Sequence, residues 1–304
     1  MTAIRLPPST ITHRGAFLLM IAAPLLWSTA GVVTRWLSPE LQAQGRFEIT
    51  FWRSLFAALT VAVFLAAVRG DLRSSLRRID RTTVLSGFMW CTMYCAFMLA
   101  LTLTTVANTL VVLSVQPLLT ALLAWMVLRR PVAGRTWLAI GLAMAGIGWM
   151  FADGVGSAGG LHLIGMLVAL AVPLAAAINL VTLEKRGAHV DLIPAVLLGG
   201  VFSAVLMLPL ALPFQAQPAD IAWLAALGIF QLGVPCMLLV AAARHLSATE
   251  ISLLALLEVL FGPLWAWVGA GEVPSATTLY GGALVLGALV FNELALKQRE
   301  APSP

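Results

Sequence analysis

Long apolar runs alternate with short polar segments along the whole chain, and this alternation predicts its secondary structure. Two clear examples run from Gly15 to Leu37 and from Leu161 to Leu183. Each run exceeds the ~20 residues that an α-helix needs to cross the hydrocarbon core of a bilayer. The pattern therefore predicts an all-α polytopic membrane protein.

Turn-forming residues divide the apolar runs into ten predicted transmembrane helices. The helices are expected at 15–37, 47–68, 82–102, 104–128, 135–152, 162–183, 191–211, 220–243, 248–269 and 277–296. The third and fourth nearly fuse at Thr102 to Thr105, and the eighth and ninth nearly fuse at Leu246 and Ser247. These two pairs are therefore predicted to be joined by very tight connections.

The composition supports the same class of protein. Hydrophobic residues make up 61% of the chain and charged residues only 10%, whereas a soluble domain has roughly a quarter of its residues charged. The net charge of +5 does not indicate nucleic-acid binding, because the arginines cluster at the ends of apolar runs. Three cysteines, Cys91, Cys95 and Cys236, lie inside apolar runs without a metal-ligand spacing. We interpret them as small buried side chains.

The positive charges predict the orientation. In the ten-helix arrangement, 15 of the 18 Lys and Arg residues fall on one side, and only Arg35, Arg46 and Arg53 lie elsewhere. The positive-inside rule makes the crowded side cytoplasmic, so both termini are predicted to be cytoplasmic. Arg53, near the outer end of its predicted helix, is expected to extend outward and anchor that end at the headgroups. The alternative hypothesis is that it attracts anionic groups at the external mouth.

An internal repeat is predicted when the chain is aligned with itself at a shift of 141 residues. Five helices per half is an odd number, so the two halves would enter the membrane from opposite sides. Such inverted repeats are typical of secondary transporters, with a substrate site near the midplane between them. The aligned identities are Gly87 with Gly228, Ala107 with Ala248, Gly141 with Gly282 and Gly146 with Gly287.

The predicted organisation has four parts. A cytoplasmic N-terminal tail at 1–14 precedes the first five-helix repeat at 15–152. The second, inverted repeat follows at 162–296, and the cytoplasmic C-terminal tail is 297–304.

Several segments carry a resemblance to a known family. They are Ala100 to Asn108, Ser114 to Pro117, Gly271-Glu272 and Gly281 to Gly287. With them the chain resembles the drug/metabolite transporter superfamily, in its ten-helix EamA-type branch. The segment Leu257 to Trp267 is similar to that of aromatic amino acid exporters of YddG type.

The resemblance implies export of amino acids or related metabolites across a bacterial inner membrane. It also implies a central cavity lined by the first, third, fourth, sixth, eighth and ninth helices. One departure is Arg129-Arg130, which stands where the family often has Gly-Glu after the fourth helix.

Glu258 is the clearest candidate for a substrate-binding residue. It lies near the middle of the predicted helix 248–269, where a charge costs about 2.5–3.5 kcal/mol on insertion scales. We expect it to bind a substrate ammonium or to carry a coupling proton. The structural alternative is an acid bonded to a neighbouring helix without substrate contact.

Two amides are further candidates, because Gln116 and Gln231 also lie at mid-depth. An amide offers donors and acceptors together, which suits a zwitterion. The alternative is a hydrogen bond between helices, worth only ~0.6 kcal/mol on average in membranes. For Asn108, closer to the outer surface, this helix-bonding interpretation is favoured.

Trp27, Trp90 and Tyr94 lie too deep in their predicted helices to be headgroup anchors. Trp90 and Tyr94 are one helical turn apart and share a face. Together the three predict an aromatic wall that binds apolar groups, or an ammonium by cation–π contact. Packing in the core or against lipid is the alternative.

Prolines and glycines within the predicted helices complete the candidates. A proline kinks a helix and frees carbonyls, so five prolines are hinge candidates, whereas small glycines permit close helix packing. The prolines are Pro24, Pro117, Pro173, Pro235 and Pro263. The glycines are Gly31, Gly141, Gly146, Gly281, Gly282 and Gly287.

Nothing in the sequence matches a GxxxxGK[ST] nucleotide loop or an HExxH metal motif. The chain is therefore expected to use no cofactor or metal, and to be no enzyme. We expect a monomeric carrier in the lipid bilayer, with a small-molecule substrate and no nucleic-acid partner. A channel and an intramembrane enzyme are alternatives. Among carriers, other neutral amino acids, cationic drugs and nucleotide sugars remain open, whereas few cavity cations argue against heavily phosphorylated substrates.

Overall fold

A computed structural model of the chain describes residues 12–67, 77, 79–129, 134–157, 160–186, 193–243, 245–246 and 248–300. All regular secondary structure within these ranges is helical. The prediction of an all-α chain is therefore confirmed for the residues described.

The helices follow the predicted order. In the first half they are α1 (His13–Trp27), α2 (Ala30–Arg35), α3 (Pro39–Gln44), α4 (Arg46–Ala67), α6 (Arg81–Leu103), α7 (Val106–Leu113), α8 (Gln116–Leu128) and α9 (Gly134–Ser157). In the second half they are α10 (Gly160–Arg186), α11 (Ile193–Ala211), α12 (Pro218–Ala226), the π-helix η1 (Leu227–Gly233), α13 (Val234–Ala242), α14 (Ala248–Ala270) and α15 (Ala276–Glu300).

Seven helical segments of the described chain are long and apolar enough to cross a membrane. They are His13–Arg35, Arg46–Ala67, Arg81–Leu103, Val106–Val127, Gly160–Thr182, Ile193–Ala211 and Pro218–Ala242. The three other predicted spans fall on α9, α14 and α15, whose apolar stretches are shorter. The short helix α3, which was not predicted, lies in the polar connection before α4.

Three of the predicted spans are interrupted helices, and prolines accompany the interruptions. Pro24 lies one turn before the break between α1 and α2, and Pro117 lies in the first turn of α8, just after the break at Ser114 and Val115. Pro235 lies in the first turn of α13, directly after η1. Pro173 and Pro263, by contrast, lie inside the continuous helices α10 and α14. Hinge motion at all five stays a prediction.

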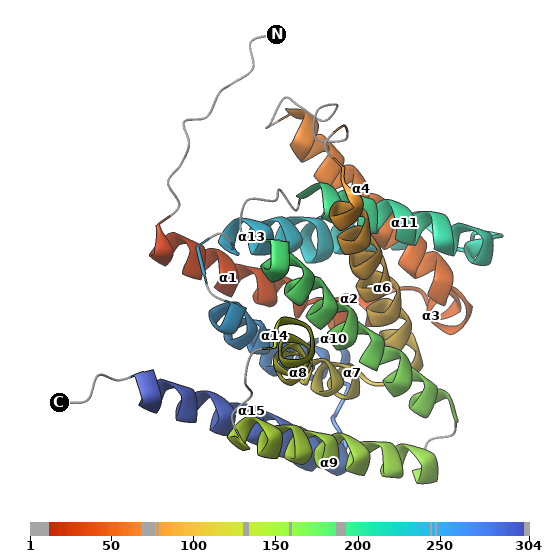
Figure 1. Cartoon of the computed structure of the whole chain (residues 1–304). Coiled ribbons are helices and arrows are strands. Elements are labelled where there is room, and N and C mark those ends of the chain that lie inside the picture. The colour runs from red at the N-terminus through yellow and green to blue at the C-terminus, as the bar shows by residue number, and fades with distance from the viewer. Residues whose placement is uncertain are drawn as a thin grey trace.

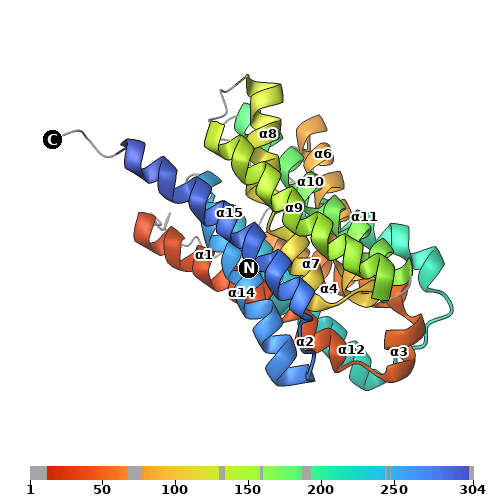
Figure 2. The ribbon, with the colours of Figure 1, turned by 90° about the horizontal axis from the view of Figure 1, so that it is seen from below.

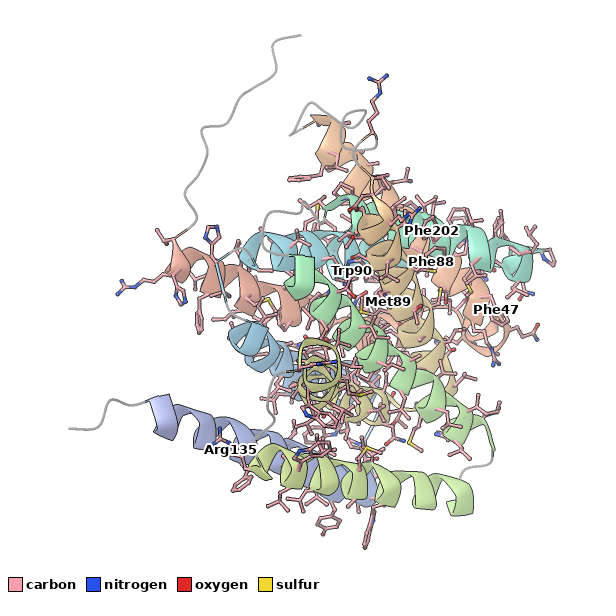
Figure 3. The ribbon with its side chains drawn as sticks, in the orientation of Figure 1. Phe47, Phe88, Met89, Trp90, Arg135 and Phe202 are labelled. Carbon is pink, nitrogen blue, oxygen red and sulfur yellow. The ribbon has the colours of Figure 1, made fainter. Side chains whose placement is uncertain are left out.

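The helices form a bundle in which α9 and α15 lie side by side as an outer pair (Figures 1 and 2). The start of α1 and the end of α15 lie at the same end of the bundle in both views. Arg135, near the start of α9, lies at that end too (Figure 3). This placement agrees with an even number of crossings between the two ends of the chain.

Helices of one half pack on helices of the other half, and helices at equivalent places in the two halves have equivalent partners. Helix α6 packs on α10 and α11, while η1 and α13 pack on α1 and α4. Helices α7 and α8 pack on α10, while α14 packs on α1 and α2. Two pairs, α4 with α11 and α9 with α15, join helices at equivalent places in the halves.

The glycines Gly87 and Gly228 lie at equivalent places in this packing. A Cβ atom added at Gly87 would lie 2.8 Å from Leu198 Cβ on α11, and one at Gly228 would lie 2.4 Å from Phe56 Cβ on α4. Each glycine therefore permits a close approach of its helix to the partner at the equivalent position.

The packing role predicted for other glycines is confirmed in part. A Cβ atom would lie 2.6 Å from Val106 at Gly31, 2.8 Å from the Gly281 carbonyl oxygen at Gly146, and 2.9 Å from Val111 at Gly282. At Gly141 and Gly287 it would meet nothing within 4 Å. The prediction is wrong for these two, because they do not lie at a helix contact.

Candidate functional site

A cavity of about 160 Å³ lies among α1, α4, α6, α7, α8, α10, η1, α13 and α14. All six residues predicted to bind substrate line it: Trp27, Trp90, Tyr94, Gln116, Gln231 and Glu258. Their helices are far apart in the sequence, so the fold is what brings them together. An engineered cavity of about 150 Å³ accepts benzene, so this space has room for an aromatic ring.

One wall of the cavity is aromatic. Trp90 and Tyr94 lie one helical turn apart on α6, with ring centroids 5.7 Å apart. Trp90 lies toward the middle of the bundle, whereas Phe88 lies beside Phe202 on α11 (Figure 3). Because Trp90 and Tyr94 are only 8% and 2% exposed, a lipid-facing position is wrong for both.

The hydroxyl of Tyr94 is buried and directed toward sulfur. It donates a hydrogen bond of 3.6 Å to Cys236 Sγ on α13. All three cysteines are free and buried, which confirms the prediction made for them. The contact also joins the aromatic wall to the second half of the chain.

Gln231 is presented to the cavity by η1, a π-helix of a kind that is frequent at functional sites. Its Nε2 donates to the Trp27 carbonyl at 3.3 Å, while its Oε1 is buried and has no partner among the residues described. The amide therefore both bonds to a neighbouring helix, as the alternative interpretation expected, and keeps a free acceptor. Since an unpaired buried acceptor costs about 1–3 kcal/mol, this oxygen is suited to a donor from a ligand.

Glu258 and Gln116 line the cavity from α14 and α8. Within the part of the chain that the structure describes, no hydrogen bond or ion pair holds either side chain. The bond between helices that was expected as the alternative is therefore not seen among these residues for either side chain. A role of both in substrate binding stays a prediction.

Arg53 also lines the cavity, which corrects its expected position at the outer surface. Its side chain is buried, and Nη1 donates to Met98 Sδ at 3.0 Å. The reason lies in the packing of α4 on α6, because the centroid of the Phe97 ring of α6 lies 5.5 Å from Arg53 Cζ and Met98 accepts its hydrogen bond. The segment 212–217 covers the outer end of the same helix, where Phe214 stacks on Phe51 with centroids 5.3 Å apart and Glu48 accepts the Gln215 N–H at 2.7 Å.

Asn179 on α10 is a second lining residue that sequence reasoning missed. Its Oδ1 is buried and finds no partner in the described part of the chain. An amide inside an apolar run was the available signal, the same one that identified Gln116 and Gln231. Asn108, in contrast, lies outside the cavity and bonds α7 to α15, because Thr278 Oγ1 donates to its Oδ1 at 2.5 Å. Its predicted bonding role is confirmed.

A polar network closes the end of the bundle that carries α3. Arg35 Nε pairs with Glu272 Oε2 at 2.9 Å, and Glu272 Oε1 accepts the Val106 N–H at 2.6 Å. Gly271, with a φ of 68°, reverses the chain after α14 so that Glu272 reaches this network. At the opposite end, the cavity lining extends to Ala243 and Ile251, beside the link from α13 to α14.

Comparison with known proteins agrees with this architecture. A family model described as the EamA-like transporter family matches residues 14–152 and again residues 163–293. One solved structure, titled only "Crystal structure of protein", aligns with a TM-score of 0.65 over 93% of this chain and 99% of that one. The two are 19% identical, so this likeness shows the fold alone. No curated protein gives a significant match.

Proposed function

Because the chain belongs to the EamA-like transporter family of the drug/metabolite transporter superfamily, we propose that it exports neutral amino acids, aromatic ones among them. Membership makes it a multi-pass membrane transporter for small molecules rather than an enzyme. Its proposed location is the bacterial inner membrane, and its proposed functional unit is a monomer, because residues of both halves of one chain line the cavity.

The observation that carries the substrate proposal is the lining of the central cavity. It combines an acid, Glu258, with unpaired amide acceptors and an aromatic wall. The acid and the amide oxygens suit an ammonium group, which has only donors to offer. The aromatic rings of Trp90 and Tyr94 suit an apolar side chain.

The proposed mechanism is alternating access between two inverted five-helix repeats. Three observations support it: the family model matches twice, the packing partners are exchanged between the halves, and Gly87 and Gly228 make equivalent contacts. Two similar halves of opposite orientation can exchange conformations at little cost. The outward-open and inward-open states are then close in free energy.

The conformation described here is proposed to be closed to the outside. The ion pair of Arg35 with Glu272 ties the end predicted to be external, while the cavity reaches Ala243 and Ile251 at the other end. A solute would enter from the cytoplasm and leave when that ion pair opens. Coupling to a proton gradient is assigned to Glu258, the acid that lines the cavity.

A second candidate function is the export of cationic compounds. Glu258 and an aromatic wall in one cavity also fit a hydrophobic cation, because the ring faces attract positive charge. The buried guanidinium of Arg53 argues against it, because it would repel such a solute.

Efflux from proteoliposomes tests the proposal. The purified protein is reconstituted, a panel of amino acids and quaternary ammonium compounds is loaded, and release is measured with and without a proton gradient. We expect saturable efflux of neutral amino acids, fastest for those with large apolar or aromatic side chains. Efflux of the cations alone would establish the second function, and flux that does not saturate would indicate a channel.

A further inference from the structure

The guanidinium of Arg53 is a buried cation that lines the cavity, within electrostatic range of Glu258 but not in an ion pair with it. Its side chain is 2% exposed, and no carboxylate of the described residues lies within ion-pair distance of it. We propose that Arg53 binds the carboxylate of the transported solute and so selects amino acids over the corresponding amines. This inference rests on the proposed function and names the group that recognises one half of the substrate.

The present partners of Arg53 do not satisfy its guanidinium. An arginine stays charged in proteins and has five N–H donors, and a buried charge left unpaired is strongly destabilising. Among the described residues, Nη1 donates only to the sulfur of Met98, a weak acceptor, and Nε has no partner. The Phe97 ring, whose centroid is 5.5 Å from Cζ, provides a modest cation–π contact. An anion from the solute would complete the site.

The chemistry of the other polar lining groups identifies which anion fits. Gln231 Oε1 and Asn179 Oδ1 are unpaired acceptors, and Glu258 is an acid, so all three favour a cationic group. Arg53 is the cation among the described lining residues. A solute with both an ammonium and a carboxylate satisfies the two kinds of group at once. A solute with only an ammonium leaves the guanidinium unpaired.

The local packing keeps Arg53 in place for this role. A Cβ atom at Gly228 of η1 would lie 2.6 Å from the Arg53 carbonyl oxygen, so the backbone of α4 is pressed against the segment that presents Gln231. The planar guanidinium matches a carboxylate with two parallel hydrogen bonds. Lysine has the same charge but lacks the two parallel donors, so Arg53→Lys tests charge separately from hydrogen-bond geometry.

The experiment compares pairs of solutes that differ only in the carboxylate. Phenylalanine and phenethylamine, and tyrosine and tyramine, compete for efflux from proteoliposomes that contain the intact protein. We expect the amino acid of each pair to compete at least tenfold better, about the effect of one charged hydrogen bond. In the Arg53→Gln variant this preference disappears because amino-acid transport falls while the amine is accepted. Arg53→Lys retains part of the preference, and Arg46→Gln, at the start of the same helix, retains all of it.

The outcomes separate the two proposals. If the unaltered protein exports amino acids but amines compete equally well, Arg53 has no carboxylate to bind and the inference is overturned while the proposed function stands. The inference is likewise overturned if Arg53→Gln is folded and keeps the original preference. If the unaltered protein exports no amino acid at all, the proposed function fails and the inference fails with it. Should Arg53→Gln not fold, the competition in the unaltered protein and in Arg53→Lys still decides.

Discussion

Arg35 and Glu272 form an ion pair in which Nε lies 2.9 Å from Oε2, although 237 positions separate them in the chain. Arg35 also donates to the Leu101 carbonyl at 3.0 Å, and Glu272 accepts the Val106 N–H at 2.6 Å. One pair of side chains thus ties α2, the α6–α7 connection and the α14–α15 connection. An opening at this end must break these bonds together.

Loss of this ion pair is expected to favour opening at that end. In Glu272→Gln, a single cysteine at Leu113 in the cavity should react roughly fivefold faster with an impermeant maleimide added from outside, since a partly exposed pair contributes ~1 kcal/mol. The background lacks Cys91, Cys95 and Cys236. Glu40→Gln, which removes an exposed acid of α3, is the matched control. Equal labelling rates in both variants would rule out a gating role.

Glu258→Gln is expected to reduce amino-acid efflux at least tenfold and to abolish its response to a proton gradient. The substitution keeps the shape of the side chain but removes the acid that the cavity directs at the solute. Rates are measured in proteoliposomes at several pH values, with Glu40→Gln as the control. An unchanged rate and an unchanged pH profile would remove Glu258 from the mechanism.

The close approach at Gly228 predicts a sharp difference between two glycine substitutions. Gly228→Ala places a Cβ 2.4 Å from Phe56 Cβ and 2.6 Å from the Arg53 carbonyl oxygen, and such overpacking typically costs about 1–3 kcal/mol. Gly287→Ala meets nothing within 4 Å and should stay within about 0.5 kcal/mol. Thermal unfolding in detergent compares the two. Equal midpoints would contradict the packing described here.

The predicted orientation is tested by labelling from each side of the membrane. Cysteines introduced singly at Arg77 and Lys297 should react only with reagent that reaches the cytoplasmic face. A cysteine at Glu40 should react only from outside. If Arg77 and Lys297 were labelled from opposite faces, the inverted arrangement of the two halves could not hold.

Much of the fold could be predicted from the sequence because hydropathy acts locally. The apolar runs located the long helices, and the tight connection at Thr104 and Thr105 is confirmed. The residues of the candidate site could be predicted from the sequence for a related reason. A polar or acidic residue inside an apolar run, such as Gln231 or Glu258, needs a compensating environment, and a central cavity is the common solution.

The parts that were missed depend on contacts between distant segments. Arg53 resembles an outer anchor until α6 is seen to pack on α4, with Met98 and Phe97 beside the guanidinium. Gly141 and Gly287 share a spacing with the packing glycines, but only the three-dimensional arrangement shows that no neighbour approaches them. Asn179 carried a usable local signal, since an isolated amide in an apolar run marks a position worth examining.

The π-helix η1 changes the directions in which its residues project from the helix axis. Its hydrogen bonds reach five residues along the chain instead of four, so each residue turns less about the axis than in an α-helix. Gly228 and Gln231, three positions apart, would project in similar directions from an ordinary α-helical turn. Here they diverge: the glycine backbone abuts α4, and the amide points to Trp27 and the central void. Deleting one residue from 227–233 would restore the tighter winding and rotate one of these two surfaces out of alignment.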